Sequence, residues 1–299
     1  MEKHNILYKI RGKIVHYSAN FLSDENYLKL YFHHRLGYKL NLDNPQTFNE
    51  KLQWLKLYDK RDEYTKMVDK VEAKKHVASI IGEQYIIPTL GVWERVDDID
   101  WESLPNQFVI KATDDSGGVI VCKDKSRLDI NQAKKKLRRK QSYCKYNKEY
   151  IYQGIRHRII AEKYMEDESG YELKDYKIFC FDGDPKLLFV ATDRHKKGEE
   201  TKFDFFDTEW NHLPFTNGHP NNPNPIEKPK HFDEMLEIAR KLSVGIPQVR
   251  IDLYNCNGTI YFGEITFFHW SGTKAFEPKE WDYKLGSLIN LPTIKNNFQ

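Results

Sequence analysis

Residues 249–266 read Val-Arg-Ile-Asp-Leu-Tyr-Asn-Cys-Asn-Gly-Thr-Ile-Tyr-Phe-Gly-Glu-Ile-Thr. Two runs of β-branched and aromatic residues flank Asn257-Gly258, a pair typical of a two-residue β-turn, so this stretch predicts a β-hairpin. Arg250, Asp252 and Glu264 stand among apolar residues, where a charge is costly unless it is paired. Two carboxylates and a guanidinium on neighbouring strands suit Mg²⁺ and a polyphosphate, because Mg²⁺ takes oxygen ligands and Arg binds phosphate.

The length of the turn decides whether the two acids meet. A two-residue turn would pair Asp252 with Gly263 and send Glu264 to the opposite face of the hairpin. A loop with an odd number of residues, such as Asn257-Gly258-Thr259 with a glycine bulge, pairs Asp252 with Glu264. The alternative is an ordinary half-exposed hairpin whose polar residues face solvent.

Length and composition describe a folded protein with more than one subdomain. The chain has 299 residues, which is long enough to bury a large core. Its hydrophobic content of 39% and aromatic content of 14% favour a folded protein, although 30% of the residues are charged. The formal net charge of +3 does not indicate a nucleic-acid-binding protein. The four cysteines lie far apart with no C-x-x-C pair, which favours reduced thiols in a cytoplasmic protein over a disulfide framework or a zinc site.

The N-terminal segment 3–15 is basic and amphipathic. It lacks the long apolar core and cleavage site of a leader, and no apolar run in the chain reaches the roughly 18–20 residues that span a bilayer. We expect a cationic helix whose apolar side packs on the body of the protein. The alternative is peripheral contact with a membrane, at its inner face.

The rest of the chain alternates between helical and extended patterns, which predicts an α+β protein with mostly antiparallel strands. The segments expected to be helical are 24–66 (with a capping box at Thr47–Glu50), 62–81 (ending at Gly82), 129–141 and 232–242. Those expected to be strands or extended, apart from the hairpin, are 85–90, 108–112, 119–122, 158–165, 176–181 and 186–192. Residues 214–230, which contain five prolines, are expected to form a surface loop.

Three further features suit phosphates or a nucleotide, although each is weak alone. Lys111 ends a strand and precedes Ser116-Gly117-Gly118, whose backbone amides can approach a phosphate, but such a sequence is also common in hairpin turns. Glu162-Lys163 ends an apolar strand and leads to Met165, and such an edge can bind an adenine ring. The basic cluster 134–140 is expected to be a solvated helix face, with contact to an anionic polymer or a membrane as the alternative.

In this order, the lysine-ended strand, the glycine loop, the Glu-Lys strand and the acidic hairpin resemble the ATP-grasp superfamily. The closer resemblance is to the TupA-like ATP-grasp proteins of bacterial surface-polysaccharide loci. It covers roughly residues 25–290, and the segments that carry it are 44–58, Asp69-Lys70, 104–111, 175–183 and 249–272.

The resemblance implies an ATP-grasp fold, with two α+β subdomains whose mostly antiparallel sheets grip ATP, plus an N-terminal helical extension. The implied regions are 1–100 (N-terminal helical), 101–161 (small lid subdomain) and 162–299 (large catalytic subdomain).

The resemblance also implies a role for individual residues. Those implied to bind ATP are Lys70, Lys111, Ser116, Gly117, Gly118, Glu162, Lys163 and Met165, with either Asp167 or Glu168 on the ribose. Those implied to hold the γ-phosphate or the acceptor carboxylate are Lys177, Arg194 and Arg250. Those implied to bind Mg²⁺ are Asp252, Glu264 and Thr266, the last at a position where many relatives have Asn.

The implied reaction is ATP-dependent amide formation through an acyl phosphate. The resemblance suggests a hexuronic acid of a capsule or other cell-surface glycan as the carboxylate, and an amino acid or amino alcohol as the amine. One alternative is a glycosyltransferase, since Asp182-Gly183-Asp184 has D-x-D spacing, although these residues are also ordinary turn formers. Another is a non-catalytic module that binds an anionic polymer through 134–140.

Overall fold

The structure is a computed structural model, and it describes residues 2–114, 118–138, 146–170, 173–194 and 198–293. The helices are α1 (Glu2–Ser18), α2 (Asp24–Leu36), α3 (Phe48–Tyr58), α4 (Asp62–Val68), α5 (Glu72–Ile81), α6 (Ile130–Leu137), α8 (Phe232–Ser243) and α9 (Glu280–Ser287). The strands are β1 (Thr89–Trp93), β2 (Phe108–Ala112), β3 (Ile120–Cys122), β4 (Ile159–Lys163), β5 (Asp175–Phe181), β6 (Asp184–Thr192), β7 (Lys202–Asp207), β8 (Val249–Cys256) and β9 (Thr259–Thr266).

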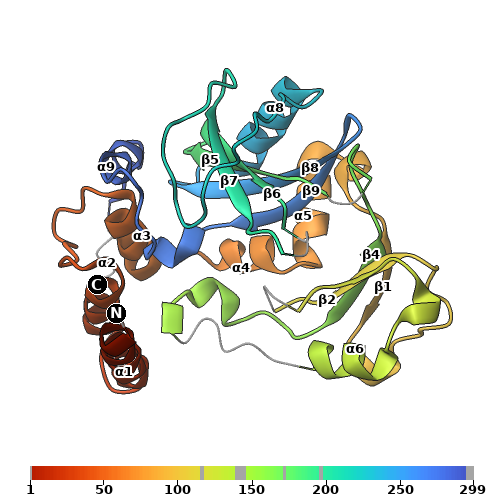
Figure 1. The fold of residues 1–299 in the computed structure, drawn as a ribbon, viewed down its shortest axis with the longest axis horizontal. Coiled ribbons are helices and arrows are strands. Elements are labelled where there is room, and N and C mark those ends of the chain that lie inside the picture. Colours follow the sequence, from red (N-terminus) through yellow and green to blue (C-terminus); the bar gives the residue numbers. More distant parts are fainter. Residues whose placement is uncertain (1, 115–117, 139–145, 171–172, 195–197, 294–299) are drawn as a thin grey trace.

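The strands form two antiparallel sheets (Figure 1). The smaller sheet has four strands in the order β1-β4-β2-β3, and the larger has five in the order β7-β6-β5-β8-β9. This confirms the α+β class. The limits of the three regions remain a prediction, and β1, at Thr89–Trp93, belongs to the same sheet as β2.

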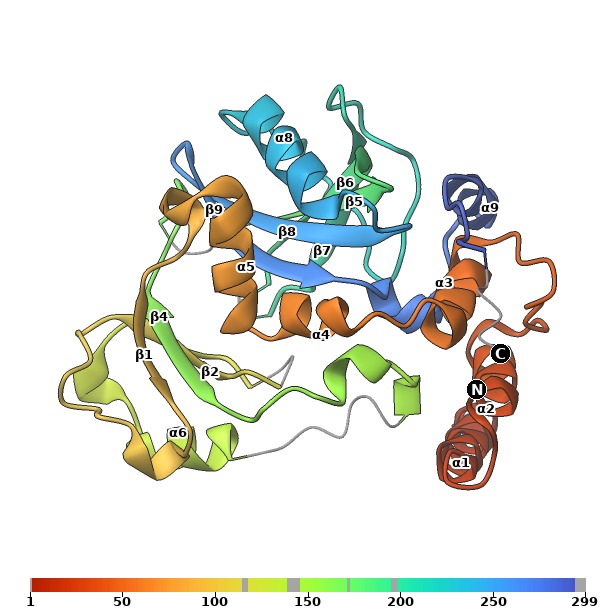
Figure 2. The same ribbon diagram turned by 180° about the vertical axis from the view of Figure 1, so that it is seen from behind.

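Each sheet has a core of its own. Helix α8 packs on β5, β6 and β8 of the larger sheet, and buries Met235 and Ile238 there. A second apolar cluster joins Phe108 and Ile110 of β2 to Leu137 of α6. Helices α4 and α5 run beside β9, on the side toward the smaller sheet (Figures 1 and 2). The two sheets therefore face each other across these helices.

The single helix expected over 62–81 is wrong, because the chain breaks between α4 and α5. Asp69 lies in the break, and its Oδ1 accepts hydrogen bonds from the backbone N–H groups of Val71 at 2.8 Å and Glu72 at 3.1 Å. These bonds satisfy amides that begin α5, as an N-terminal cap does. The break leaves Lys70 in a non-helical link between the two helices.

Several predicted boundaries also move. The strand expected over 85–90 begins only at Thr89, and the strand expected over 158–165 ends at Lys163, so Met165 lies beyond it. The basic helix ends at Leu137, and residues 139–145 lie outside the described part of the chain. Residues 214–230 form a loop as expected.

The capping box predicted at the start of α3 is confirmed and buried. Thr47 Oγ1 accepts from the Glu50 N–H at 3.1 Å, and Glu50 Oε2 accepts from the Thr47 N–H at 3.0 Å. Only 1% of Thr47 is exposed. Removal of its hydroxyl therefore leaves the Glu50 N–H without a hydrogen-bond partner, and no water can replace the lost bond.

We therefore expect Thr47→Ala to lower the free energy of unfolding by about 1–2 kcal/mol. Urea denaturation measures this change. The matched variant Ser79→Ala, at an exposed position of α5, is expected to cause no loss, because Ala is the better helix former. Equal stability of Thr47→Ala and the unchanged protein would contradict the structural role of the box.

Candidate active site

The charged residues of the hairpin lie on one face of the larger sheet. Asp252 pairs with Glu264 across β8 and β9, which is the register expected for a loop with an odd number of residues, and Lys177 of β5 pairs with Asp252 on its other side. Directly paired residues point to the same face, so the three side chains form a row across three strands. The side chain of Asp252 is only 1% exposed, which rules out the alternative of a solvent-facing hairpin.

The three-residue loop proposed for this register is wrong. Cys256 pairs with Thr259, and Asn257 and Gly258 have φ values of 56° and 96°, so the turn has two residues and the left-handed backbone that Asn-Gly favours. The extra residue lies instead in β9, where the ladder is irregular around Gly263. A Cβ at Gly263 would lie 2.9 Å from the Asp252 carbonyl oxygen, so the bulge requires a glycine.

Arg250 organises the acids of this row. Its Nε donates to Asp252 Oδ1 at 2.7 Å, and one terminal nitrogen donates to Asp252 Oδ2 at 2.8 Å. The same terminal nitrogen donates to Thr266 Oγ1 at 3.0 Å and lies 3.5 Å from Glu264 Oε1. Lys177 Nζ also binds Asp252 Oδ2. Asp252 is thus held in one orientation by a guanidinium and an ammonium group.

A buried histidine holds the far side of Arg250. The second terminal nitrogen of Arg250 lies 2.8 Å from His269 Nδ1, and His269 Nε2 lies 2.8 Å from Asn217 Oδ1. Because a guanidinium only donates, Nδ1 must accept, and Nε2 therefore carries the proton that it donates to Asn217. Burial, with Arg250 and Lys177 nearby, lowers the pKa of His269 well below its usual value. His269 is therefore a neutral acceptor.

Asp175 orients Lys177 and one further cation, Arg194, at the edge of the row. Its Oδ2 binds Arg194 and lies 3.1 Å from Lys177 Nζ. Its Oδ1 is buried and has no partner among the described residues. The sequence pattern contains Asp175 but gave it no role. The structure thus places Lys177, Arg194 and Arg250 around Asp175 and Asp252. Their implied role on the γ-phosphate or the acceptor carboxylate stays a prediction.

The acids of the row fit a magnesium–nucleotide better than a free metal ion. Burial acts to raise the pKa of Glu264, but Lys177, Arg250 and Lys70 hold it below the ordinary value, and the side chain is 52% exposed. Glu264 is therefore an ionised oxygen donor at the opening of the site. No cluster of three His, Cys, Asp or Glu side chains that suits a metal occurs in the described part of the chain. Mg²⁺ bound by one or two carboxylates takes its remaining ligands from phosphates and water.

Two lysines of the smaller sheet and α5 share one carboxylate. Lys111 Nζ lies 2.5 Å from Glu162 Oε2, and Lys74 Nζ lies 2.5 Å from Glu162 Oε1. Burial opposes the ionisation of Glu162, but Lys111 and Lys74 lower its pKa below the usual value. Sequence reasoning missed Lys74, whose only signal was its position on α5.

Lys70 connects the smaller sheet to the acidic row. Its Nζ donates to the Thr113 carbonyl oxygen at 3.2 Å, and its charge helps to lower the pKa of Glu264 on the larger sheet. The preceding Asp69 receives two bonds from one terminal nitrogen of Arg158, at 2.8 and 2.9 Å. Lys70 therefore lies between the two sheets, at the start of the predicted phosphate loop. Of that loop, Ser116 and Gly117 lie outside the described residues, and Gly118 is buried.

The residues implied for adenine and ribose lie on β4 and in the segment that follows it. The Lys163 N–H donates to the Pro88 carbonyl oxygen at 3.0 Å, and Met165 follows two residues later. Asp167 is buried and bound to the N–H groups of Ser169 and Lys174, so its carboxylate is already occupied. Glu168, the other ribose option, is the more accessible acid.

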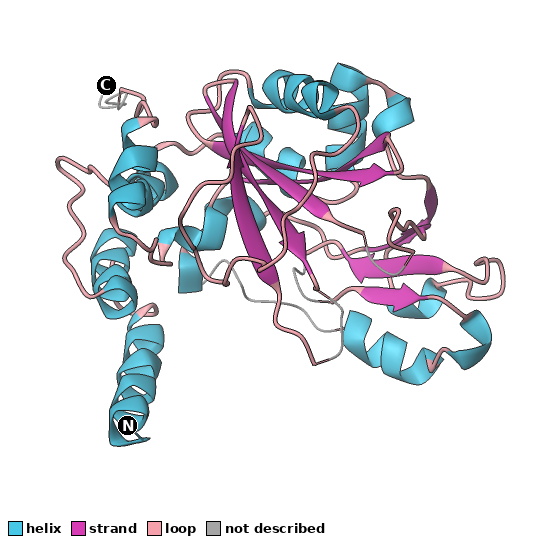
Figure 3. Cartoon of the chain, turned by 45° about the horizontal axis from the view of Figure 1, so that its top comes forward, coloured by secondary structure: helices cyan, strands magenta, loops and turns pink. Residues whose placement is uncertain are grey.

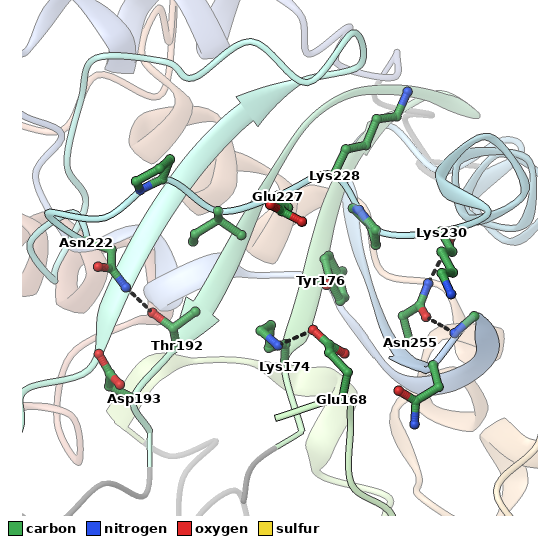
Figure 4. Close-up of a pocket in the computed structure, with 15 residues that line it drawn as sticks. Glu168, Lys174, Tyr176, Thr192, Asp193, Asn222, Glu227, Lys228, Lys230 and Asn255 are labelled. Carbon is green, nitrogen blue, oxygen red and sulfur yellow. Dashed lines mark hydrogen bonds and ion pairs between the residues drawn. The ribbon is translucent and has the colours of Figure 1, made fainter. Parts of the chain in front are cut away.

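Glu168 lies beside a cavity of about 510 Å³ (Figure 4). Its Oε1 accepts from Lys174 Nζ at 2.6 Å, and Tyr176 and Asn255 line the same cavity. Tyr176 alternates with Lys177 along β5, so this cavity opens on the other face of the larger sheet. The structure therefore does not bring Glu168 to the acidic row.

Three solved structures to which the chain is similar are at most 18% identical to it. The chain is similar to D-alanine–D-alanine ligase from Bacillus anthracis complexed with ATP, with 18% identity and a TM-score of 0.37, over 67% of this chain and 53% of that one. It is similar to D-cycloserine synthetase DcsG with 13% identity and a TM-score of 0.41, over 75% of this chain and 70% of that one. It is also similar to N5-carboxyaminoimidazole synthase from Aspergillus clavatus, with 12% identity and a TM-score of 0.40, over 78% of this chain and 54% of that one. The chain thus spans about half the length of the first of these enzymes.

No curated protein matches the sequence. A family model described as TupA-like ATPgrasp matches residues 50–290, which is most of the chain. This range includes Lys70, Lys111 and the whole row of the larger sheet. The chain therefore belongs to the TupA-like ATP-grasp family.

Proposed function

We propose that this protein is an ATP-dependent carboxylate–amine ligase that forms an amide through an acyl phosphate. The observation that carries the proposal is the row Lys177–Asp252–Glu264, with Arg250 beside Asp252 on β8. Lys70, in the link between α4 and α5, adds a cation near Glu264. Acids that suit Mg²⁺ and cations that suit phosphates lie together there, and this is the combination that phosphoryl transfer requires.

In this proposal, the cations neutralise charge while the γ-phosphoryl group moves. A carboxylate oxygen of the acceptor attacks the γ-phosphorus, the bond to the β,γ-bridging oxygen breaks, and ADP leaves. Lys70 and Lys111 bind phosphate oxygens, and Lys177 and Arg194, oriented by Asp175, bind the acceptor carboxylate or the γ-phosphate. Mg²⁺, held by Asp252 and Glu264 with Thr266 beside them, would neutralise charge on the phosphates.

The second half-reaction joins the amine. The amine nitrogen attacks the acyl carbon, inorganic phosphate leaves with the electron pair of the C–O bond, and the nitrogen loses a proton. We propose a hexuronic acid of a cell-surface glycan or its precursor as the carboxylate, and an amino acid or amino alcohol as the amine. The family resemblance to proteins of surface-polysaccharide loci supports this choice.

The D-x-D spacing does not favour a glycosyltransferase. Asp182 and Gly183 form the turn between β5 and β6, with φ values of 51° and 83°, and Asp184 pairs with Lys186 at 2.5 Å. These residues therefore have an ordinary structural role in a hairpin turn.

A nucleotide-dependent thermal shift tests the proposal. With ATP and Mg²⁺ at about 100 times the dissociation constant, binding adds about 2.7 kcal/mol of stability, which raises Tm by about 4 °C for a protein of this size. A UDP-sugar is expected to leave Tm unchanged. Stabilisation by UDP-sugars alone would overturn the ligase proposal in favour of a glycosyltransferase.

An ADP-release screen then identifies the substrates. Uronic acids, free or as nucleotide sugars, are paired with a panel of amines. We expect ADP release that depends on both partners and stops when either is omitted. ADP formation that is indifferent to every carboxylate would contradict the proposed acceptor class.

A further inference from the structure

The N-terminal helix α1 packs on the body through one narrow side only. Val15 and Ala19 are 5% and 7% exposed, and the ring of Tyr8 stacks on His34 of α2 at 4.4 Å. Figure 3 shows α1 extending away from both sheets. The expectation that the apolar side of this segment packs on the protein is therefore wrong for most of its apolar residues.

A second apolar face of α1 is open to solvent. Leu7, Ile10, Ile14 and Tyr17 are 56%, 49%, 63% and 68% exposed, and Phe21, in the turn that follows, is 71% exposed. These positions are three or four residues apart, so they form one stripe along the helix, on the side away from Val15. We call Leu7, Ile10, Ile14, Tyr17 and Phe21 the apolar stripe. Its length and continuity are unusual for a free surface.

A basic cavity lies directly beside the stripe. It has a volume of about 610 Å³ between α1 and α2, and it is lined by Lys9, Lys13, His16, His34 and Arg35 together with tyrosines. None of the described residues that line it is acidic. Burial, and then the charges of Arg35, His16 and Arg11, lower the pKa of His34. The cavity is therefore a region of crowded positive charge that suits an anion.

We propose that α1 docks on the surface of a bilayer that contains anionic phospholipid. The apolar stripe enters the boundary between headgroups and acyl chains, and Lys9, Lys13 and Arg35 bind headgroup phosphates. Apolar residues on one side of a helix and lysines along its flank are the features that hold a helix in the plane of such an interface. No helix in the described ranges is long and apolar enough to cross a membrane, so α1 lies on the surface.

Charge complementarity favours this occupant over the others. A second copy of the chain packed on the stripe would bring two sets of Lys9, Lys13 and Arg35 close together, and like charges repel. A nucleic acid would bind the basic cavity but would leave the apolar stripe in water. Only an anionic bilayer uses both features at once.

Vesicle sedimentation with the full-length protein tests the proposal. Vesicles of phosphatidylglycerol and phosphatidylcholine are expected to carry the protein into the pellet, and vesicles of phosphatidylcholine alone are expected to do so far less. High salt is expected to weaken the binding, because it screens the attraction to the headgroups. This experiment needs no catalytic activity, so its result is independent of the proposed ligase reaction.

Two double variants separate the contribution of the apolar stripe to vesicle binding from that of the lysines. Ile10→Gln with Ile14→Gln is expected to weaken binding more than about tenfold, and Lys9→Gln with Lys13→Gln about 30-fold. The matched controls are Val244→Gln, whose side chain is apolar and 71% exposed, and Lys75→Gln with Lys241→Gln, whose side chains are 72% and 54% exposed. Both controls are expected to bind as the unchanged protein does.

Several outcomes would overturn the proposal. They are a protein that stays in the supernatant with both kinds of vesicle, equal binding to both kinds, and equal losses in the variants and their controls. A dimer in solution that Ile10→Gln with Ile14→Gln converts to a monomer would assign the stripe to a second copy. Binding to single-stranded DNA that competes with vesicles and is lost in the lysine variant would assign the cavity to a nucleic acid.

Discussion

Glu264→Gln is expected to abolish ADP release, with a fall in kcat of about a thousandfold or more. Glu264 is the exposed member of the carboxylate pair, and it is ionised because Lys177 and Arg250 lower its pKa. Gln has the same shape but no charge, so it removes the electrostatic part of metal and phosphate binding alone. The measurement is ADP release by a coupled assay at saturating ATP and Mg²⁺.

The fold is expected to survive this substitution. Glu264 Oε1 lies 3.5 Å from its nearest partners, and its side chain faces the opening, so Tm is expected to change little. Glu237→Gln on α8, with a side chain 50% exposed, is the matched control and is expected to keep full activity. Full activity in Glu264→Gln would rule out the metal assignment.

Arg250→Lys is expected to lower the free energy of unfolding by about 3 kcal/mol, although it keeps the charge. One guanidinium binds Asp252 twice, Thr266 once and His269 once. A lysine has one nitrogen on a flexible stem and cannot reach all of these acceptors. At least one buried acceptor is then left without a donor. Urea denaturation measures the loss.

Arg240→Lys is the matched control for this prediction. Arg240 lies on α8, is 49% exposed and pairs with Glu237 at 2.7 Å, so its replacement is expected to change stability by less than about 0.5 kcal/mol. ADP release by Arg250→Lys is expected to fall as well, because Asp252 loses its orientation. A loss of stability equal to that of the control would show that charge alone holds the site.

The order of charged residues made the row of the larger sheet predictable. The sequence does not show, however, which residue sets the pairing of Asp252 with Glu264. Alternation shows that Asp252 and Glu264 share a face only if one extra residue lies between them. It does not show where that residue lies, because a glycine is equally suited to a turn and to a bulge. The structure places it at Gly263 and not at Thr259.

Helix α1 shows a second limit of sequence reasoning. Its apolar residues occupy two faces, and periodicity predicts that an apolar face exists without showing which one packs. The small residue Gly12 allows close approach to α2, where a Cβ would lie 3.2 Å from His34 Nε2, and the larger Ile10 and Ile14 remain exposed. Which face of α1 packs depends on the surface of α2, and the sequence of α1 does not describe that surface.

The support around Arg250 could not be predicted because it comes from distant segments. Asn217 lies in the proline-rich loop, and nothing in the local sequence distinguishes it from the neighbouring asparagines. Its amide donates to the backbone oxygens of residues 274 and 275, which turns its own oxygen toward His269. Only the folded chain brings these three segments together.

The bulge at Gly263 separates the acidic end of the hairpin from its tip. Between the bulge and the turn, β8 and β9 pair regularly from Leu253–Phe262 to Cys256–Thr259. Adding or removing one residue on each strand in this outer part would change the length of the hairpin without moving Glu264 relative to Asp252. Related chains are therefore expected to differ in hairpin length by equal numbers of residues on the two strands. The tip of the hairpin can then vary while the pair of acids stays in place.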